Sequence, residues 1–167
     1  MIKKERKVKN KIVNFSEIPD LKRKYAKKKI VLVGGCFDIF HFGHLTFLTE
    51  AKKQGDKLVI VLESDEFILK YKKREPIHNQ FQRAQILSNL DIVDKIILLP
   101  LFKGYDDYLK LVRMLKPSVI AVTEGDERYY EKNQMAKVVK AQLKVVCSLA
   151  SVSSTSKIIE YATFFGN

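Results

Sequence analysis

The stretch IVLVGGCFDIFHFGH, residues 30–44, decides the fold. It begins with four aliphatic residues, continues through a glycine pair, and ends in two histidines that flank a further glycine. A continuous apolar run is typical of a strand buried on both faces, because a strand with one wet face alternates polar and apolar residues. The glycines that follow indicate a tight loop. The stretch therefore predicts the first strand, loop and helix start of a parallel α/β sheet.

Four more apolar runs of the same kind follow along the chain. They lie at residues 58–62, 96–99, 119–122 and 144–147. Stretches of helical period separate them, at residues 43–54, 80–90, 105–116 and 128–142, and a last helix is expected from Ser154. This alternation predicts an α/β fold, namely a Rossmann-like, doubly wound, five-stranded parallel sheet with helices on both faces.

In such a sheet, ligands bind beyond the carboxyl ends of the strands, where the strand order reverses. The loops after the first and fourth strands, residues 34–44 and 123–128, are therefore expected to converge. The helix that begins near Gly43 offers free N–H groups and a positive dipole end to an anion. His41 and His44 flank this helix start and can donate to the same anion. The loop predicts a phosphate site.

The residues of this loop support three other kinds of site less well. Dinucleotide binding requires G-x-G-x-x-G here, and that pattern is absent, although Glu63 at the end of the second strand could hold a ribose. The phosphate loop G-x-x-x-x-G-K-[ST] is absent from the chain. A zinc ion on His41 and His44 would need further ligands, and the nearest cysteine, Cys36, lies in the same tight loop. We predict no metal site made by protein ligands.

Length and composition indicate one globular unit. The chain has 167 residues, of which 46% are hydrophobic and 30% charged, so it can bury a core. No apolar run approaches the roughly 18 residues of a membrane span, and the first residues, MIKKERKVKN, lack the apolar stretch of a secretory signal. Cys36 and Cys147 form no C-x-x-C pair. We expect a cytoplasmic protein without a membrane partner or structural disulfides.

The positive charge is concentrated near the N-terminus. Residues 1–29 hold 12 Lys/Arg and 3 acidic residues, which accounts for +9 of the net +12. We expect a basic N-terminal arm and helix at 1–29 and a second unit at 30–167. The arm is either a solvated lysine-rich surface or a docking segment for a polyanion such as a nucleic acid. An apolar face of Phe15, Ile18 and Leu21 could pack on the body.

The loop after the first strand resembles the hallmark of the cytidylyltransferase-like nucleotidyltransferases, G-x-F-D-x-x-H-x-G-H. The fixed positions are occupied by Gly35, Phe37, Asp38, His41, Gly43 and His44. The resemblance extends to about residue 161. Later segments similar to the family's are the lysine-bearing loop with Lys70, Lys72 and Lys73, the helix segment Gln82-Arg83, the turn Val93-Asp94, the pair Gly125-Asp126, and the signature Ser153-Ser154-Thr155.

The resemblance implies an enzyme that transfers a nucleotidyl group from a nucleoside triphosphate to a phosphorylated small molecule and releases pyrophosphate. It implies Mg²⁺ with the triphosphate, and a homodimer. The implied catalytic residues are His41, His44, Lys70 and Lys73. The implied nucleotide-binding residues are Gly35, Cys36, Phe37, Asp38, Gly43, Arg83, Gly125, Asp126, Ser153, Ser154 and Thr155.

Two departures within the family bear on the substrates. Cys36 stands where glycerol-3-phosphate cytidylyltransferases carry a threonine, and resembles the G-C-F-D of enzymes that adenylylate heptose 1-phosphate. Ser148 lies about where those cytidylyltransferases have an arginine. Both favour ATP over CTP and a sugar phosphate acceptor. A glycerol-3-phosphate-type cytidylyltransferase, an FMN adenylyltransferase, and a polyanion-binding module with a sensory nucleotide site remain as alternatives.

Overall fold

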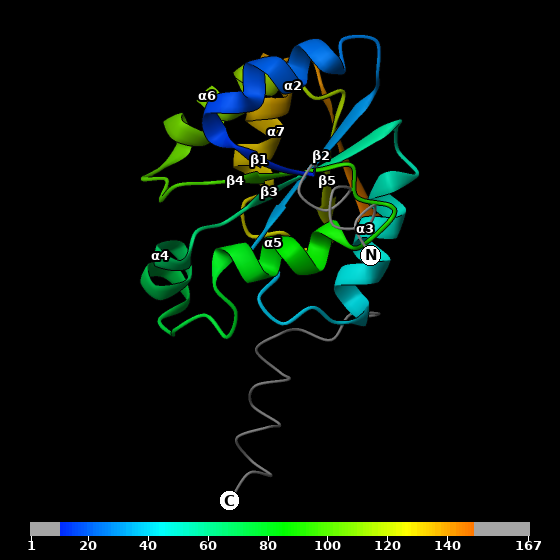
Figure 1. The fold of residues 1–167 in the computed structure, drawn as a ribbon. Coiled ribbons are helices and arrows are strands. Elements are labelled where there is room, and N and C mark those ends of the chain that lie inside the picture. The colour runs from blue at the N-terminus through cyan, green and yellow to red at the C-terminus, as the bar shows by residue number, and fades with distance from the viewer. Residues whose placement is uncertain (1–10, 149–167) are drawn as a thin grey trace, which may run out of the picture.

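A computed structural model of the chain describes residues 11–148, and they form one six-stranded parallel sheet covered by helices (Figure 1). The strands are β1 (Ile12–Asn14), β2 (Ile30–Gly35), β3 (Lys57–Leu62), β4 (Lys95–Leu98), β5 (Val119–Thr123) and β6 (Gln142–Cys147). Their order is β1-β4-β3-β2-β5-β6. The order reverses beside β2, because the chain adds β3 and β4 on one side and β5 and β6 on the other.

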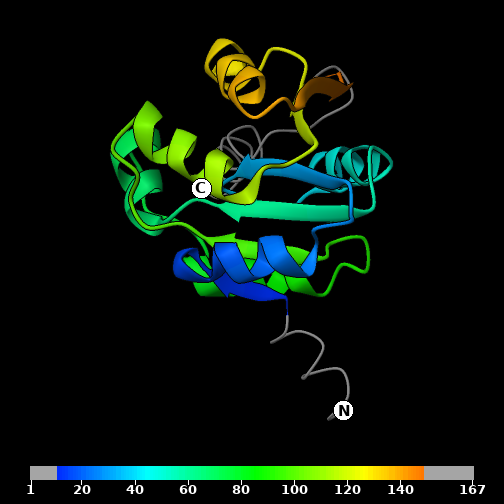
Figure 2. The same cartoon turned by 90° about the horizontal axis from the view of Figure 1, so that it is seen from above.

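Helices cover both faces of the sheet, as Figures 1 and 2 show. They are α2 (Ile18–Lys24, preceded by a 3₁₀ turn at Phe15–Glu17), α3 (Phe42–Lys52), α4 (Asp65–Phe67, continued by a π-helical turn at Ile68–Lys72), α5 (Gln80–Ser88), α6 (Tyr105–Leu115) and α7 (Tyr129–Val138). In Figure 1, α2, α6 and α7 lie on one side of the sheet, and α3 and α5 lie on the other. None of the described helices is long and apolar enough to span a bilayer.

Each face of the sheet has its own hydrophobic core. Leu32 of β2 belongs to the cluster under α2, α6 and α7, whereas its neighbours Val31 and Val33 belong to the cluster under α3 and α5. All three side chains are at most 4% exposed. The continuous apolar run of β2 is therefore used on both faces, which is the reason it does not alternate.

The α/β doubly wound fold class predicted from the sequence is confirmed, with one more strand than expected. The five predicted strands correspond to β2–β6. The sixth, β1, pairs in parallel with β4, with Ile12 opposite Ile96 and Val13 opposite Ile97. It was missed because an edge strand of three residues with two aliphatic side chains gives too short a pattern among the surrounding lysines.

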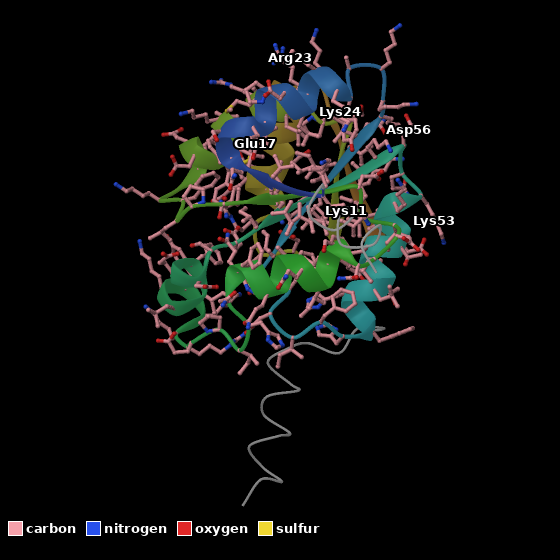
Figure 3. The ribbon with its side chains drawn as sticks, in the orientation of Figure 1. Lys11, Glu17, Arg23, Lys24, Lys53 and Asp56 are labelled. Atoms are coloured by element: carbon pink, nitrogen blue, oxygen red, sulfur yellow. The ribbon has the colours of Figure 1, made fainter. Side chains whose placement is uncertain are left out.

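Part of the predicted basic arm belongs to the fold. Strand β1 continues the sheet, and Ile18 and Leu21 of α2 are 0% and 4% exposed in the core that α6 shares. Arg23 and Lys24 of α2 are exposed, and Arg23 lies at the outer edge of the molecule (Figure 3). Basic residues of α2 thus form a solvated helix face, while its apolar residues hold the edge of the sheet.

We expect Ile18→Ala to lower the free energy of unfolding by about 2–5 kcal/mol, because it removes a fully buried aliphatic side chain between α2 and the sheet. Chemical denaturation monitored by circular dichroism measures the change. Lys27→Ala, on the exposed surface of the same segment, should stay within about 0.5 kcal/mol of wild type. If Ile18→Ala changes stability as little as Lys27→Ala does, α2 is not part of the cooperative fold.

Candidate active site

A cavity of about 760 Å³ lies at the carboxyl ends of β2, β3 and β5. Both loops that were expected to converge contribute to its wall, Gly34–Asp38 with His44 from the first and Thr123 with Gly125–Arg128 from the second. Its floor is apolar, with Leu32, Val61 and Ile120 from the sheet. The size and the mainly apolar lining with a few polar groups are those of a small-molecule site.

His41 and His44 form one structural unit at the start of α3. His41 is the N-cap residue, and its Nδ1 accepts a hydrogen bond from the backbone N–H of His44 at 3.4 Å. The two rings stack with their centroids 3.8 Å apart. Because Nδ1 of His41 is the acceptor, the proton of the neutral ring lies on Nε2, which remains as a donor.

Both imidazoles are neutral at physiological pH. Burial, with a smaller contribution from the charge of the neighbouring His41, lowers the pKa of His44 to about 4. Burial also lowers the pKa of His41. Phe37 and Phe40 flank the His44 ring with centroid distances of 4.9 and 5.7 Å. The pair therefore presents N–H donors held by packing, without a full positive charge.

Phe37 explains why the loop needs its glycine pair. The Phe37 backbone is left-handed, with a φ of 47°, and its ring is buried at 4% exposure. A Cβ on Gly35 would lie 2.9 Å from that ring. Left-handed backbone is costly for a bulky residue and persists where packing over-determines it. Gly35 thus makes room for Phe37, which in turn supports His44.

Asp38 lines the cavity and fastens a second loop to its rim. Its Oδ1 accepts hydrogen bonds from the backbone N–H groups of Ile77 at 2.9 Å and His78 at 3.1 Å, and its Oδ2 pairs with the Arg74 guanidinium. Burial alone would raise the pKa of this carboxyl, but these hydrogen bonds hold it below the ordinary value. Both oxygens are occupied, so Asp38 organises the site.

Arg83 is not on the cavity wall, in contrast to the nucleotide contact that the resemblance implied. Its side chain is fully buried, and its guanidinium donates to the backbone oxygens of Cys36, Glu63 and His78. It also pairs with the carboxylate of Asp65 at 2.8 Å. A buried guanidinium is stable only when its N–H groups are paired in this way. We therefore assign Arg83 a positioning role.

Lys70 and Lys73, the predicted catalytic lysines of the lysine-bearing loop, do not line the cavity. The lining residues from this segment are Lys72 and Arg74. Lys70 instead lies over the ring of Tyr71, 5.1 Å from its centroid, and Lys73 ends the π-helical turn in a left-handed conformation. Within residues 11–148 no ion pair involves Lys72. Lys72 is therefore the cation of this loop that is best placed for a phosphate.

The pair Gly125-Asp126 lies in the cavity wall after β5. Gly125 has a left-handed φ of 72°, which glycine adopts without strain. Asp126 accepts from the backbone N–H of Arg128 at 2.9 Å and from Lys132 at 2.6 Å, so it shapes the turn into α7. The third predicted group, Ser153, Ser154 and Thr155, lies outside the described residues.

Glu63, Tyr108 and Arg128 form a cluster in the cavity that the sequence did not identify as a site. The Tyr108 hydroxyl donates to Oε1 of Glu63 at 2.8 Å, and the Arg128 guanidinium lies 4.2 Å from the centre of the Tyr108 ring. Burial raises the pKa of Glu63, and burial with the Glu63 charge raises that of Tyr108. In the sequence, Tyr108 is one residue within the predicted helical stretch 105–116. The sequence feature that could have identified this cluster is Glu63, an acidic residue directly after a buried strand.

The described residues contain no cluster of three or more side chains able to ligate a metal ion. Asp38 and Asp126, which lie in the two loops that converge on the cavity, are already paired with Arg74 and Lys132. Mg²⁺ commonly binds through substrate phosphates, with few protein ligands and several waters. The site therefore fits an ion that arrives with a triphosphate better than a resident ion.

Comparison with known proteins agrees with this geometry. The cytidylyltransferase-like family model matches residues 32–160. The chain is 37% identical over 150 residues to the bifunctional protein HldE of Aliarcobacter butzleri, an alignment that covers 88% of this chain and 30% of that protein. It is 34% identical over 145 residues to the FAD synthase of Thermococcus sibiricus, covering 80% and 93%. The chain thus spans less than a third of HldE but nearly all of the FAD synthase.

Solved structures show the same architecture. The lipopolysaccharide core biosynthesis protein of Thermoplasma volcanium matches with a TM-score of 0.60 and 27% identity, covering 75% of this chain and 99% of that one. A pantoate-beta-alanine ligase from Francisella tularensis, at 18% identity and a TM-score of 0.64, shares the fold, with 87% and 69% covered. Fold and site together define a nucleotidyltransferase. The chain belongs to the cytidylyltransferase-like family.

We expect Arg83→Met to lower the free energy of unfolding by about 3–5 kcal/mol, because it leaves the Asp65 carboxylate and three carbonyls without their donor. Denaturant titration measures the loss. The control Arg113→Met makes the same change on the exposed side of α6 and should cost less than about 0.5 kcal/mol. Equal stability of the two variants would contradict the role given to Arg83.

The pKa of His44 predicts an acid dependence of stability. Between pH 6.5 and 4 an unfolded histidine binds a proton that His44 does not bind in the folded protein. Stability is therefore lost as the pH falls through this window, by up to about 3 kcal/mol from His44. His44→Gln should lack this part of the slope, and His78→Gln, outside the cavity, should keep it. Parallel slopes for wild type and His44→Gln would contradict the assignment.

Proposed function

We propose that this nucleotidyltransferase transfers a nucleotidyl group, AMP in preference to CMP, from a nucleoside triphosphate to the phosphate of a small molecule and releases pyrophosphate. A sugar phosphate such as heptose 1-phosphate is the proposed acceptor. The observation that carries the proposal is the stacked His41–His44 pair at the start of α3, beside a cavity at the switch point of the sheet. Membership of the cytidylyltransferase-like family supports it.

In the proposed reaction, an oxygen of the acceptor phosphate attacks the α-phosphorus of the triphosphate. A new P–O bond forms to the acceptor, the bond between the α-phosphorus and the bridging oxygen breaks, and pyrophosphate leaves with the electron pair. Such transfer asks the protein mainly for positioning and for donors at the developing charge. His41 and His44 would supply N–H donors to the phosphate oxygens, together with the free N–H groups of the α3 N-terminus.

Cations on two sides of the cavity would hold the remaining phosphate charge. Lys72 is proposed for this role in place of Lys70 and Lys73, because it lines the cavity. Lys132 also lines the cavity and already neutralises Asp126. Mg²⁺ would enter with the triphosphate and neutralise part of its charge. The predicted contribution of Ser154 and Thr155 stays a prediction.

The preference for ATP rests on Cys36. Its thiol lines the cavity, and burial raises its pKa to about 11, so it is a weak neutral hydrogen-bonding group. In a cytidylyltransferase with a hydroxyl at this position, that hydroxyl can contact CTP. The thiol of Cys36 would not replace that contact. The FAD synthase relative keeps FMN as an alternative acceptor for the same AMP transfer. A glycerol-3-phosphate-type cytidylyltransferase is the alternative that needs CTP.

Pyrophosphate release tests the proposed function directly. Purified protein with Mg²⁺ and either ATP or CTP is assayed with heptose 1-phosphate, glycerol 3-phosphate and FMN as separate acceptors. The proposal expects release that depends on both the nucleotide and one acceptor, with ATP and heptose 1-phosphate giving the highest kcat/KM. Absence of release with every pair would contradict the reaction and favour the sensory, polyanion-binding alternative.

We expect His41→Ala and His44→Ala each to lower turnover by about 10²-fold or more, because each removes a preorganised donor to charge that develops in the transition state. Steady-state pyrophosphate release measures the change, and circular dichroism checks that each variant is folded. His78→Ala changes the chain's third histidine, which is not at the start of α3. It is the control and should keep turnover within a few-fold. A folded His44→Ala with wild-type turnover would remove His44 from the mechanism.

We expect ATP to bind at least tenfold more tightly than CTP. Ser148 stands about where the cytidylyltransferases have an arginine, and loss of a charged donor from a site built around it typically costs ~1.5–3 kcal/mol, which corresponds to roughly ten- to hundredfold discrimination. Calorimetric titration of both nucleotides with Mg²⁺ measures the difference. CTP binding tenfold more tightly than ATP would reverse the assignment and make a polyol phosphate the first acceptor to test.

A further inference from the structure

Glu63 carries an unused hydrogen-bonding atom inside the cavity. Its side chain is 7% exposed, its Oε1 accepts from Tyr108, and its Oε2 is buried without a hydrogen-bond partner among residues 11–148. A buried carboxyl oxygen left without a donor costs free energy, so native proteins rarely keep one unless a ligand or water completes it. Glu63 is also one of the residues that line the cavity.

The surroundings of Glu63 define the chemistry of the missing partner. A carboxylate repels phosphate, so the anionic part of a ligand would lie elsewhere, toward the histidines at the start of α3. The cavity lining includes the apolar side chains Val61 of β3 and Leu111 and Val112 of α6. The nearby cations Arg128 and Lys132 are already paired with Glu131 and Asp126. An uncharged group that donates a hydrogen bond, above all a hydroxyl on a carbon skeleton, matches both features.

The sheet topology indicates which substrate reaches this point. The backbone N–H of Glu63 donates to Gly35 at 3.1 Å, so Glu63 is directly beside the phosphate loop on the β3 side of β2. Gly125 and Asp126, which resemble the family's nucleotide segment, lie on the opposite side, after β5. If Gly125 and Asp126 hold the nucleotide, as the resemblance implies, a ligand that extends from the histidines toward β3 and α6 is the acceptor.

We propose that Glu63, oriented by Tyr108, selects the acceptor by accepting a hydrogen bond from one of its hydroxyl groups. The residue acts on specificity and takes no part in the bond-making step. Tyr108 fixes the rotamer of Glu63 through its 2.8 Å hydrogen bond, and the Arg128 guanidinium lies against the Tyr108 ring. This role rests on the proposed function and deepens it, because it predicts an acceptor rich in hydroxyls, such as a sugar or polyol phosphate.

Removing the Glu63 carboxylate and removing the acceptor hydroxyl that it binds should each lower kcat/KM. The two losses should not add when both groups are removed. The assay measures pyrophosphate release with ATP, using heptose 1-phosphate and its monodeoxy analogues as acceptors. With wild type, one deoxy analogue should lose at least tenfold in kcat/KM. Glu63→Ala should lose at least tenfold with heptose 1-phosphate, through KM, and should no longer distinguish that analogue. The Kd for ATP, measured by calorimetry, should change less than twofold.

Two further variants keep the test independent of folding defects. Tyr108→Phe leaves the carboxylate but removes its donor, and should raise the acceptor KM several-fold without changing the Kd for ATP. Glu66→Gln, an exposed glutamate on α4 outside the cavity lining, is the matched control and should match wild type.

The outcomes separate this inference from the proposed function. Pyrophosphate release by wild type with an unchanged acceptor KM in folded Glu63→Ala would overturn the role of Glu63 and leave the reaction standing. A tenfold weaker Kd for ATP with an unchanged acceptor KM would overturn it too, because Glu63 would then bind the nucleotide. No release by wild type with heptose 1-phosphate, glycerol 3-phosphate or FMN would overturn both.

Discussion

The buried guanidinium of Arg83 is the interaction on which the site depends. A charged group without exposure to water must be paired completely, and Arg83 finds one partner just before its own helix and two in segments that meet only when the sheet is assembled. These are the carbonyl of Cys36 in the phosphate loop, the carbonyl of Glu63 at the end of β3, and the carbonyl of His78 on the rim. The need to pair the Arg83 charge therefore fixes the phosphate loop, the end of β3 and the rim segment relative to each other.

The cavity built on this framework separates charge along its length. Two neutral imidazoles and the N-terminus of α3 offer donors near the switch point, with Lys72 nearby as a full positive charge. Toward β3 and α6 the polar groups include the Glu63 carboxyl and the Tyr108 hydroxyl that is bonded to it, and the lining also includes apolar side chains. Such a division suits a ligand pair whose phosphates meet at the histidines while an uncharged, hydroxyl-bearing part extends toward Glu63.

The sequence predicted the central strands and the position of the phosphate loop. It did not predict the features that depend on local geometry. The central strands were predictable because both faces are buried, and the position of the phosphate loop followed from the switch-point rule. The edge strand Ile12–Asn14 was too short to give a pattern. The inward direction of Arg83 and the choice of Lys72 over Lys73 depend on a helix face and on a π-helical turn, which residue type does not reveal. Glu63 was considered only as a ribose contact of a dinucleotide, and this loop lacks the glycine pattern that dinucleotide binding requires.

The central claim, that His41 and His44 bind the phosphates of a nucleoside triphosphate, can be measured atom by atom. Imidazole ¹⁵N resonances of the three histidines are followed while an ATP analogue with a non-hydrolysable α–β bridge and Mg²⁺ are added. The account expects saturable shifts of the His41 and His44 Nε2 resonances, while those of His78 stay in place as an internal reference. Saturable binding of the analogue that leaves both His41 and His44 unchanged would contradict it.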